Sequence, residues 1–138
     1  MSAIVCATGN GNLSRHVQAR AVEIARRQQQ RLVFVHVVDV SQWAELDESL
    51  HDAAQAELGW LGAAVLRLAQ DRAQRRGVQA DSVVLYGPIC ATLERFLIQQ
   101  AVDLLLMGEA TDTTLIAFAR HVQDDLGIPV QLVVAPAD

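Results

Sequence analysis

The loop Gly9-Asn10-Gly11 is the first place where residue types and their spacing allow specific chemistry. Two glycines around one residue let backbone N–H groups approach an anion closely, as phosphate-binding nests do. The same spacing is typical of a plain turn between a strand and a helix, where glycine only supplies backbone freedom. Both interpretations stay open, and the turn is the commoner of the two.

Histidine and cysteine side chains are the other candidates for catalysis or metal binding. They lie scattered along the chain without ligand spacing or a CxxC pair, at His16, His36, His51, His121, Cys6 and Cys90. His36 lies in an apolar run, which favours a hydrogen-bonded core histidine over a ligand. Cys90 follows a Gly-Pro turn at the expected start of a helix, where a thiolate can be stabilised for redox sensing, but an inert thiol is the simpler interpretation. No nucleophile–base pair can be assembled, so we expect neither enzyme activity nor a bound metal.

All 11 cationic side chains of this 138-residue chain are arginines, against 16 acidic residues and a net charge of −5. Without lysine, neither a Walker A loop nor a Schiff-base lysine is present. The acidic balance disfavours nucleic-acid binding. We expect no membrane segment, because no apolar run reaches about 18 residues. The start of the chain has no basic segment before an apolar one, which favours a cytoplasmic location.

Five short apolar runs predict the strands that position these residues, at 3–8, 32–38, 82–86, 103–107 and 130–134. Nearly continuous apolar runs are typical of parallel strands covered on both faces. Amphipathic stretches between them predict four helices. This alternation predicts an α/β fold in which residues 1–138 form a single domain, an open five-stranded parallel sheet with helices on both faces.

The longest predicted helix spans residues 48–76 and is amphipathic. The apolar residues on one side of it are Leu50, Ala54, Leu58, Leu61, Val65 and Leu68. Gly59 and Gly62 inside this helix each cost about 1 kcal/mol relative to alanine, which indicates close packing or a bend. Trp43, in the loop before the helix, is a candidate lid or partner contact, while simple packing on the helix is expected for both Trp43 and Trp60.

Several collinear motifs resemble the universal stress protein (UspA-like) family. They are Ile4–Thr8, His36–Asp39, Gly87-Pro88, Asp103–Gly108 and Ile128–Val130. The resemblance implies a Rossmann-like sheet in the order 3-2-1-4-5, with the ligand site at the switch point between the first and fourth strands. It also implies a dimer, commonly made through the last strand.

Many members of that family bind ATP through Gly-x2-Gly-x9-Gly-Ser/Thr after the fourth strand and an Asp soon after the first. Gly108 matches the first glycine, but Thr111 and His121 stand at the other two, and Val122 replaces the hydroxyl residue. Gly9 occupies the Asp position. Glu109 and Asp112 add negative charge that opposes a polyphosphate.

Two other positions of the family's pocket do match, namely Thr8 and Val38, the latter lying against adenine in the family. The resulting pocket positions are Thr8, Gly9, Val38, Gly108, Thr111 and Thr113. In favour of binding, Thr111, Thr113 and Thr114 supply hydroxyls at a helix N-terminus, and Arg15 is near enough in sequence to reach the loop. We expect no ATP of the usual kind, with ATP or AMP kept as the less favoured cofactors.

The run Val130–Val134 is the expected edge strand, and an uncovered apolar edge is an aggregation hazard unless it is paired. Pairing with a second copy gives a two-fold interface, in agreement with the family. We therefore predict a dimeric universal-stress-type regulatory module that has lost the standard ATP site and acts through protein contacts or an unidentified ligand. The alternative is a nucleotide or small-molecule binder with a modified phosphate loop.

Overall fold

A computed structural model describes residues 2–8, 12–39, 47–109 and 113–134 of the chain. Strands and helices alternate along these residues. The elements are β1 (Ala3–Thr8), α1 (Asn12–Gln28), β2 (Arg31–Val38), α2 (Glu48–Arg75), β3 (Ala80–Tyr86), α3 (Ile89–Gln99), β4 (Val102–Gly108), α4 (Thr113–Asp124) and β5 (Val130–Val133). Their bounds agree with the predicted runs to within one or two residues.

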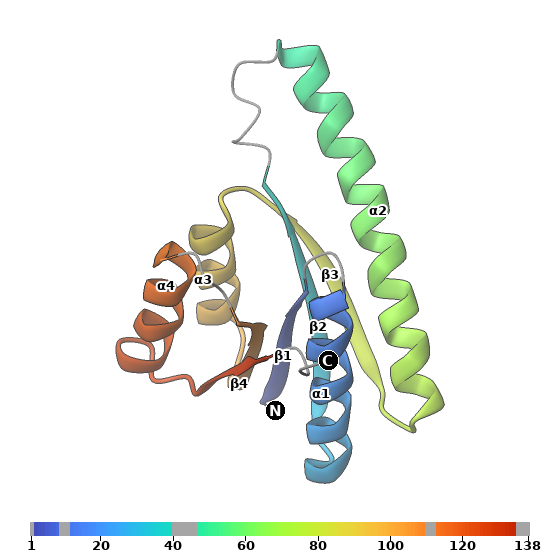
Figure 1. Cartoon of the computed structure of the whole chain (residues 1–138), viewed down its shortest axis with the longest axis vertical. Helices are drawn as coiled ribbons and strands as arrows, with labels where there is room; N and C mark the ends of the chain where they lie inside the picture. The colour runs from blue at the N-terminus through green and yellow to red at the C-terminus, as the bar shows by residue number, and fades with distance from the viewer. Residues whose placement is uncertain (1, 9–11, 40–46, 110–112, 135–138) are drawn as a thin grey trace.

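The strands form one parallel sheet in the order β3-β2-β1-β4-β5, as the family resemblance implies. β1 lies at the centre, where Cys6 pairs with Phe34 of β2 on one side and with Leu106 of β4 on the other. Helices α1 and α2 cover one face of the sheet, and α3 and α4 cover the other (Figure 1). The fold is therefore a three-layer Rossmann-like sandwich.

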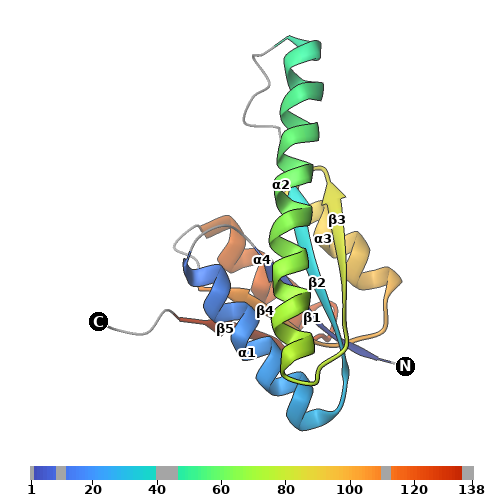
Figure 2. The same ribbon diagram turned by 90° about the vertical axis from the view of Figure 1, so that its right-hand side faces the viewer.

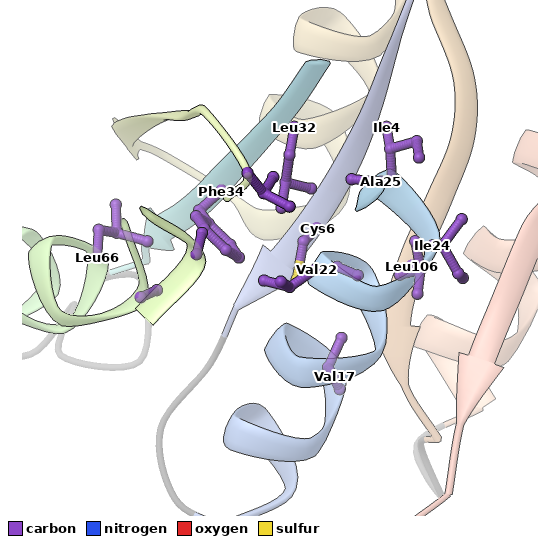
Figure 3. Close-up of a cluster of buried hydrophobic side chains, with 14 residues drawn as sticks. Ile4, Cys6, Val17, Val22, Ile24, Ala25, Leu32, Phe34, Leu66 and Leu106 are labelled. Carbon is purple, nitrogen blue, oxygen red and sulfur yellow. The ribbon is translucent and has the colours of Figure 1, made fainter. Parts of the chain in front are cut away.

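The core is divided in two by the sheet, because successive side chains of a strand point to opposite faces. Ile4 and Cys6 of β1 join the cluster beneath α1 and α2, together with Phe34 and Leu66 (Figure 3). Val5 of β1 joins the second cluster, beneath α3 and α4. Every residue of β1 except Ala7 is buried, which explains the continuous apolar run in its sequence.

Helix α2 packs on the sheet through its smallest residues. Its buried residues are Gly59, Gly62, Leu66, Ala69 and Ala73. A Cβ at Gly62 would lie 2.4 Å from Cδ2 of His36, and one at Gly59 would lie 2.2 Å from the hydroxyl of Tyr86. The two glycines therefore allow α2 to pack closely on the sheet, which is one of the two explanations that the sequence offered for them.

The apolar side of α2 is largely exposed, contrary to the usual behaviour of an amphipathic helix. Leu50, Leu61 and Leu68 are 50%, 45% and 57% exposed. Trp60 is 70% exposed, so the expectation that it packs simply on the helix is wrong. The physical reason is that the glycine and alanine side approaches the sheet more closely, which leaves the leucines facing away. Trp43 lies outside the described residues.

Candidate functional site

The carboxyl edge of the sheet is the candidate site, because the strand order reverses between β1 and β4. In open α/β sheets, ligands bind outside the carboxyl ends of strands at such a switch point. Thr8 ends β1, Val38 ends β2, Gly108 ends β4, and Thr113 begins α4. The structure therefore places these four predicted site residues at this edge, while Gly9 and Thr111 lie outside the described residues.

Thr8 and His36 hold each other in place on the floor of this edge. The hydroxyl of the buried Thr8 donates to the carbonyl oxygen of Val35 at 3.2 Å. Nδ1 of His36 lies 3.1 Å from the carbonyl oxygen of Thr8, so Nδ1 carries the proton and donates. With Gly62 against its ring, His36 is a structural histidine, as its place in an apolar run indicated.

Asp39 directly follows β2 and contacts the start of α3, close to the point where β3 ends. The carbonyl oxygen of Val38 accepts a hydrogen bond of 3.0 Å from the N–H of Gly87. One carboxylate oxygen of Asp39 accepts the N–H of Ile89 at 3.3 Å, at the first residue of α3. A negative charge is favourable at a helix N-terminus. Asp39 thus occupies the positive end of α3, which an anionic ligand would otherwise approach.

The family's ATP pattern, counted from Gly108, extends beyond the connection between β4 and α4. Only residues 109–112 separate Gly108 from Thr113, whereas the pattern puts twelve residues between its first and third glycines. His121 and Val122, at the last two positions of the pattern, lie well inside α4. Val122 is fully buried in the core, so it has no access to a phosphate.

His121 is held by carboxylates from two directions, and this network was not predicted. Its Nε2 lies 2.5 Å from Glu94 of α3, and its Nδ1 lies 2.6 Å from Asp125. Hydrogen bonds to Glu94 and then to Asp125 raise the pKa of His121. The four-residue spacing of His121 and Asp125 is compatible with a contact within one helix and could have indicated this pair. The contact with Glu94 depends on how α3 and α4 pack.

The two cysteines differ in environment. Cys6 is fully buried, and desolvation raises the pKa of its thiol, which keeps it protonated and inert. Cys90 is half-buried in the first turn of α3, against the second core cluster. Among the described residues, no group of three or more histidine, cysteine or acidic side chains is placed to hold a metal ion. None of the described helices combines the length and apolar character that crossing a membrane requires.

A groove that is separate from the carboxyl edge of the sheet lies between α1 and α2. This groove has a volume of about 1240 Å³. Its lining includes seven arginines, which are Arg15, Arg20, Arg26, Arg27, Arg72, Arg75 and Arg76. The sequence did not indicate it, because the two sets of arginines are far apart along the chain and meet only when the helices pack. Arg15 thus lines a groove in addition to lying near the start of α1.

The open parallel sheet with its switch point between β1 and β4 defines a Rossmann-like α/β protein. A sequence model of the Universal stress protein family matches residues 1–120, and the chain belongs to that family. None of the curated proteins compared with the chain matches it significantly.

Solved structures of the same family resemble the chain over nearly its whole length. A family member from Burkholderia pseudomallei is 28% identical with a TM-score of 0.73, over 99% of this chain and 96% of that one. The universal stress protein UspA from Lactobacillus plantarum is 21% identical with a TM-score of 0.74, over 98% and 97%. A universal stress protein from Archaeoglobus fulgidus in complex with dAMP is 17% identical with a TM-score of 0.66, over 96% and 97%. The last two likenesses concern the fold.

Proposed function

We propose that residues 1–138 form one cytoplasmic universal-stress-type domain that acts as a dimeric regulatory module and does not hold ATP through the family's usual glycine loop. The observation that carries this proposal is the four-residue connection between Gly108 and Thr113. The reduced thiols of Cys6 and Cys90 are compatible with a reducing compartment. The module then acts through protein contacts, because its family pocket lacks the residues that grip a triphosphate.

The experiment that tests the loss of ATP binding has two parts. The purified protein is denatured and its extract is examined by mass spectrometry for ATP, and the folded protein is titrated with ATP in a thermal-shift assay. We expect no stoichiometric ATP and no shift. A ligand present at about 100 times its Kd would stabilise the fold by about 2.7 kcal/mol, an effect that is easily measured. Stoichiometric ATP in the extract would contradict the proposal.

A second candidate function is binding of a nucleoside monophosphate. Its support is the pocket itself, since Val38 and the N-terminus of α4 at Thr113 remain at the carboxyl edge, and the related structure from Archaeoglobus fulgidus contains dAMP. A single phosphate needs fewer loop contacts than three. Under this alternative, Thr113 and the backbone N–H groups of the first turn of α4 take the phosphate.

A matched pair of variants tests the second candidate. Thr113 is exposed, so Thr113→Glu should preserve the fold, and its charge is favourable at a helix N-terminus. The same charge repels a phosphate, whereas Thr113→Gln is of equal size and neutral. If AMP raises the melting temperature of the wild type, we expect the shift to disappear in Thr113→Glu and to persist in Thr113→Gln. Equal shifts in both variants would place any bound AMP elsewhere.

A further inference from the structure

The arginines of the chain gather on one side of the molecule, where α1 and α2 lie side by side on the sheet (Figure 2). Seven of the 11 arginines line the groove between these helices, whereas Glu23 is the one acidic residue of 16 among the described lining residues. The protein as a whole has a net charge of −5, so its positive charge is concentrated in this groove. A local excess of cations on an acidic protein indicates a site for an anionic partner.

Three of these arginines already have a carboxylate partner within the chain. Glu23 pairs with Arg20 at 3.4 Å and with Arg27 at 2.8 Å. Arg75 pairs with Asp71 at 2.9 Å. Within the described part of the chain, the other four form no ion pair, and they are Arg15, Arg26, Arg72 and Arg76. These four are available to carboxylates of a partner, which a guanidinium group binds through two parallel hydrogen bonds.

The four arginines without an ion pair come from both sides of the groove. Arg15 and Arg26 lie on one stripe of α1, because eleven residues correspond to three turns of helix. Arg72 lies in the last turns of α2, and Arg76 directly follows that helix. Nη1 of Arg72 donates to Oε1 of the buried Gln18 at 3.5 Å, which directs this side chain across the groove toward α1.

An exposed apolar stripe of α2 leads into the groove. Leu61 and Leu68 are 45% and 57% exposed. Spacings of seven and four residues place Leu61, Leu68 and Arg72 on one face of the helix. The lining of the groove also includes apolar residues, namely Ala19, Val22 and Ala69. Exposed apolar surface that is continuous with an arginine-rich groove is typical of a protein interaction surface.

A helix of a partner protein fits both features. We propose that the stripe and the groove together bind an amphipathic helix of another protein, with its apolar side chains on the stripe and its acidic side chains against the arginines. Leu61 and Arg75 are fourteen residues apart, or about 21 Å along α2, which matches about four turns of a partner helix. An apolar helical face that packs into a groove is a common mode of recognition. The inference rests on the proposed function in one respect, which is that the module acts through protein contacts.

A polyanion is a less suitable occupant than an acidic helix. A single phosphate group reaches one or two guanidinium groups, whereas Arg15 and Arg26 are about 16 Å apart along α1. Nucleic acid would neutralise the arginines over this length, but it would leave Leu61 and Leu68 exposed to water. An acidic amphipathic helix neutralises the arginines and covers the leucines at the same time.

Fluorescence anisotropy with labelled synthetic peptides tests the proposal. The acidic peptide is about 16 residues long, enough for four turns of helix, with leucines along one face and glutamates on both sides of them. Its two controls are a version with glutamine in place of every glutamate and a scrambled version of the same composition. We expect the acidic peptide to bind at least about tenfold more tightly than either control, and its advantage over the glutamine version to fall as salt is raised.

Neutral variants of the protein locate the binding. The groove variant carries Arg15→Gln and Arg72→Gln, and the stripe variant carries Leu68→Gln. The control variant, Arg95→Gln with Arg120→Gln, removes the same charge from exposed positions of α3 and α4 on the other face of the sheet. We expect the groove variant to bind the acidic peptide about tenfold more weakly than the wild type, and the control to bind it equally well. The groove variant should bind the glutamine peptide as the wild type does, whereas the stripe variant should weaken both peptides.

The outcomes separate the possible occupants of the groove, once circular dichroism has confirmed that each variant is folded. Equal binding of the acidic peptide by the groove variant and the wild type, or no preference over the glutamine peptide, would overturn the proposal. Displacement of the peptide by inorganic tripolyphosphate or a single-stranded oligonucleotide at lower concentrations than by unlabelled peptide would overturn it in favour of a polyanion. Self-association that is lost in the groove variant, without peptide binding, would overturn it in favour of a second copy.

The peptide experiment and the ATP experiment can fail separately, because the groove is separate from the carboxyl edge of the sheet. Stoichiometric ATP in the extract would contradict the proposed function and would leave a measured preference for the acidic peptide standing. An absence of that preference would remove the partner helix while the loss of the usual ATP site stood.

Discussion

His121 joins α3 and α4 through both nitrogens of its ring. The ring lies between Glu94 and Asp125, and hydrogen bonds to these two carboxylates raise its pKa. A histidine whose pKa is higher in the folded state binds its proton more tightly when the protein is folded. The protonated form therefore stabilises the packing of the two helices.

The sign of this effect predicts how stability depends on pH. The contribution of His121 is fully present below the unfolded-state pKa of about 6.5 and is lost as pH rises through the raised folded-state value. We expect the melting temperature of the wild type to exceed that of His121→Gln at pH 5.5, and this difference to shrink at pH 8.5. His16→Gln, on the exposed side of α1, is the control and should show no such change. A difference that grows with pH would contradict the assignment.

The predicted site residues differ in how far the sequence alone could place them in the fold. Thr8, Val38 and Gly108 were chosen from the family resemblance, and the strand pattern agrees with it, since a residue at the end of a parallel strand lies at the carboxyl edge. His121 stands at the third glycine of the family pattern when residues are counted, but it falls in the last predicted helical stretch, and it lies in α4. The pairing of His121 with Glu94 depends on how α3 and α4 pack, so neither segment of sequence indicates it alone.

At the scale of the elements, α2 is the clearest departure from a pattern. Leucine periodicity correctly indicated an amphipathic helix, but the face that packs on the sheet is the one with glycine and alanine. Both faces have helical spacing, so periodicity alone does not choose between them. The choice depends on the sheet, where His36 and Tyr86 leave room only for residues without a side chain.

Replacing the two packing glycines by alanine should have opposite effects. Alanine is favoured over glycine in a helix by about 1 kcal/mol. At Gly62 the new methyl group meets the ring of His36, which is held by Thr8, and overpacking of this kind costs about 1–3 kcal/mol. At Gly59 it meets the outer end of Tyr86, a 49% exposed side chain that can rotate away.

Urea unfolding measures both variants against the wild type. We expect Gly62→Ala to lower the free energy of unfolding and Gly59→Ala to leave it unchanged or to raise it by up to about 1 kcal/mol. Each variant serves as the control for the other, because the helix and the substitution are the same. Equal effects at the two positions would show that the contacts with His36 and Tyr86 do not decide the packing.

At the scale of the whole molecule, the free edge of β5 remains the predicted site of strand pairing. The carbonyl oxygen of Pro129 accepts the N–H of Leu105 in β4 at 2.9 Å, and that of Val133 accepts the N–H of Glu109, directly after β4, at 2.8 Å. Alternation along a strand therefore directs the N–H of Leu132 away from β4, toward the open edge. A second copy that extends the sheet needs this N–H group.

Leu132→Pro removes that N–H and should abolish pairing through β5 while the fold is kept, since proline is tolerated where an edge N–H faces outward. Leu132→Ala keeps the N–H and should retain the pairing. Gln131→Pro removes an N–H that faces β4, and it should destabilise the monomer instead. Sedimentation at micromolar concentration distinguishes these outcomes. A wild type that is already monomeric at micromolar concentration would count against edge pairing.

The layered architecture could be foreseen from the alternation of elements, whereas the arginine groove could not. The strands and helices follow from local periodicity and turn residues, which each segment carries itself. The groove combines Arg15 and Arg27 of α1 with Arg72 and Arg75 of α2, and no short segment contains both sets. Surfaces that arise between elements depend on packing and have no signature in one stretch of sequence.

The first turns of α2 lack the buried residues that hold the rest of the helix on the sheet. Asp47 caps the helix by accepting the N–H of Leu50 at 3.1 Å. Beyond this cap, none of residues 48–58 is buried, so these turns depend on local hydrogen bonds and on propagation from the packed turns that follow. The amide hydrogens of residues 48–58 should therefore exchange with solvent faster than those of the packed turns from Gly59 to Ala73.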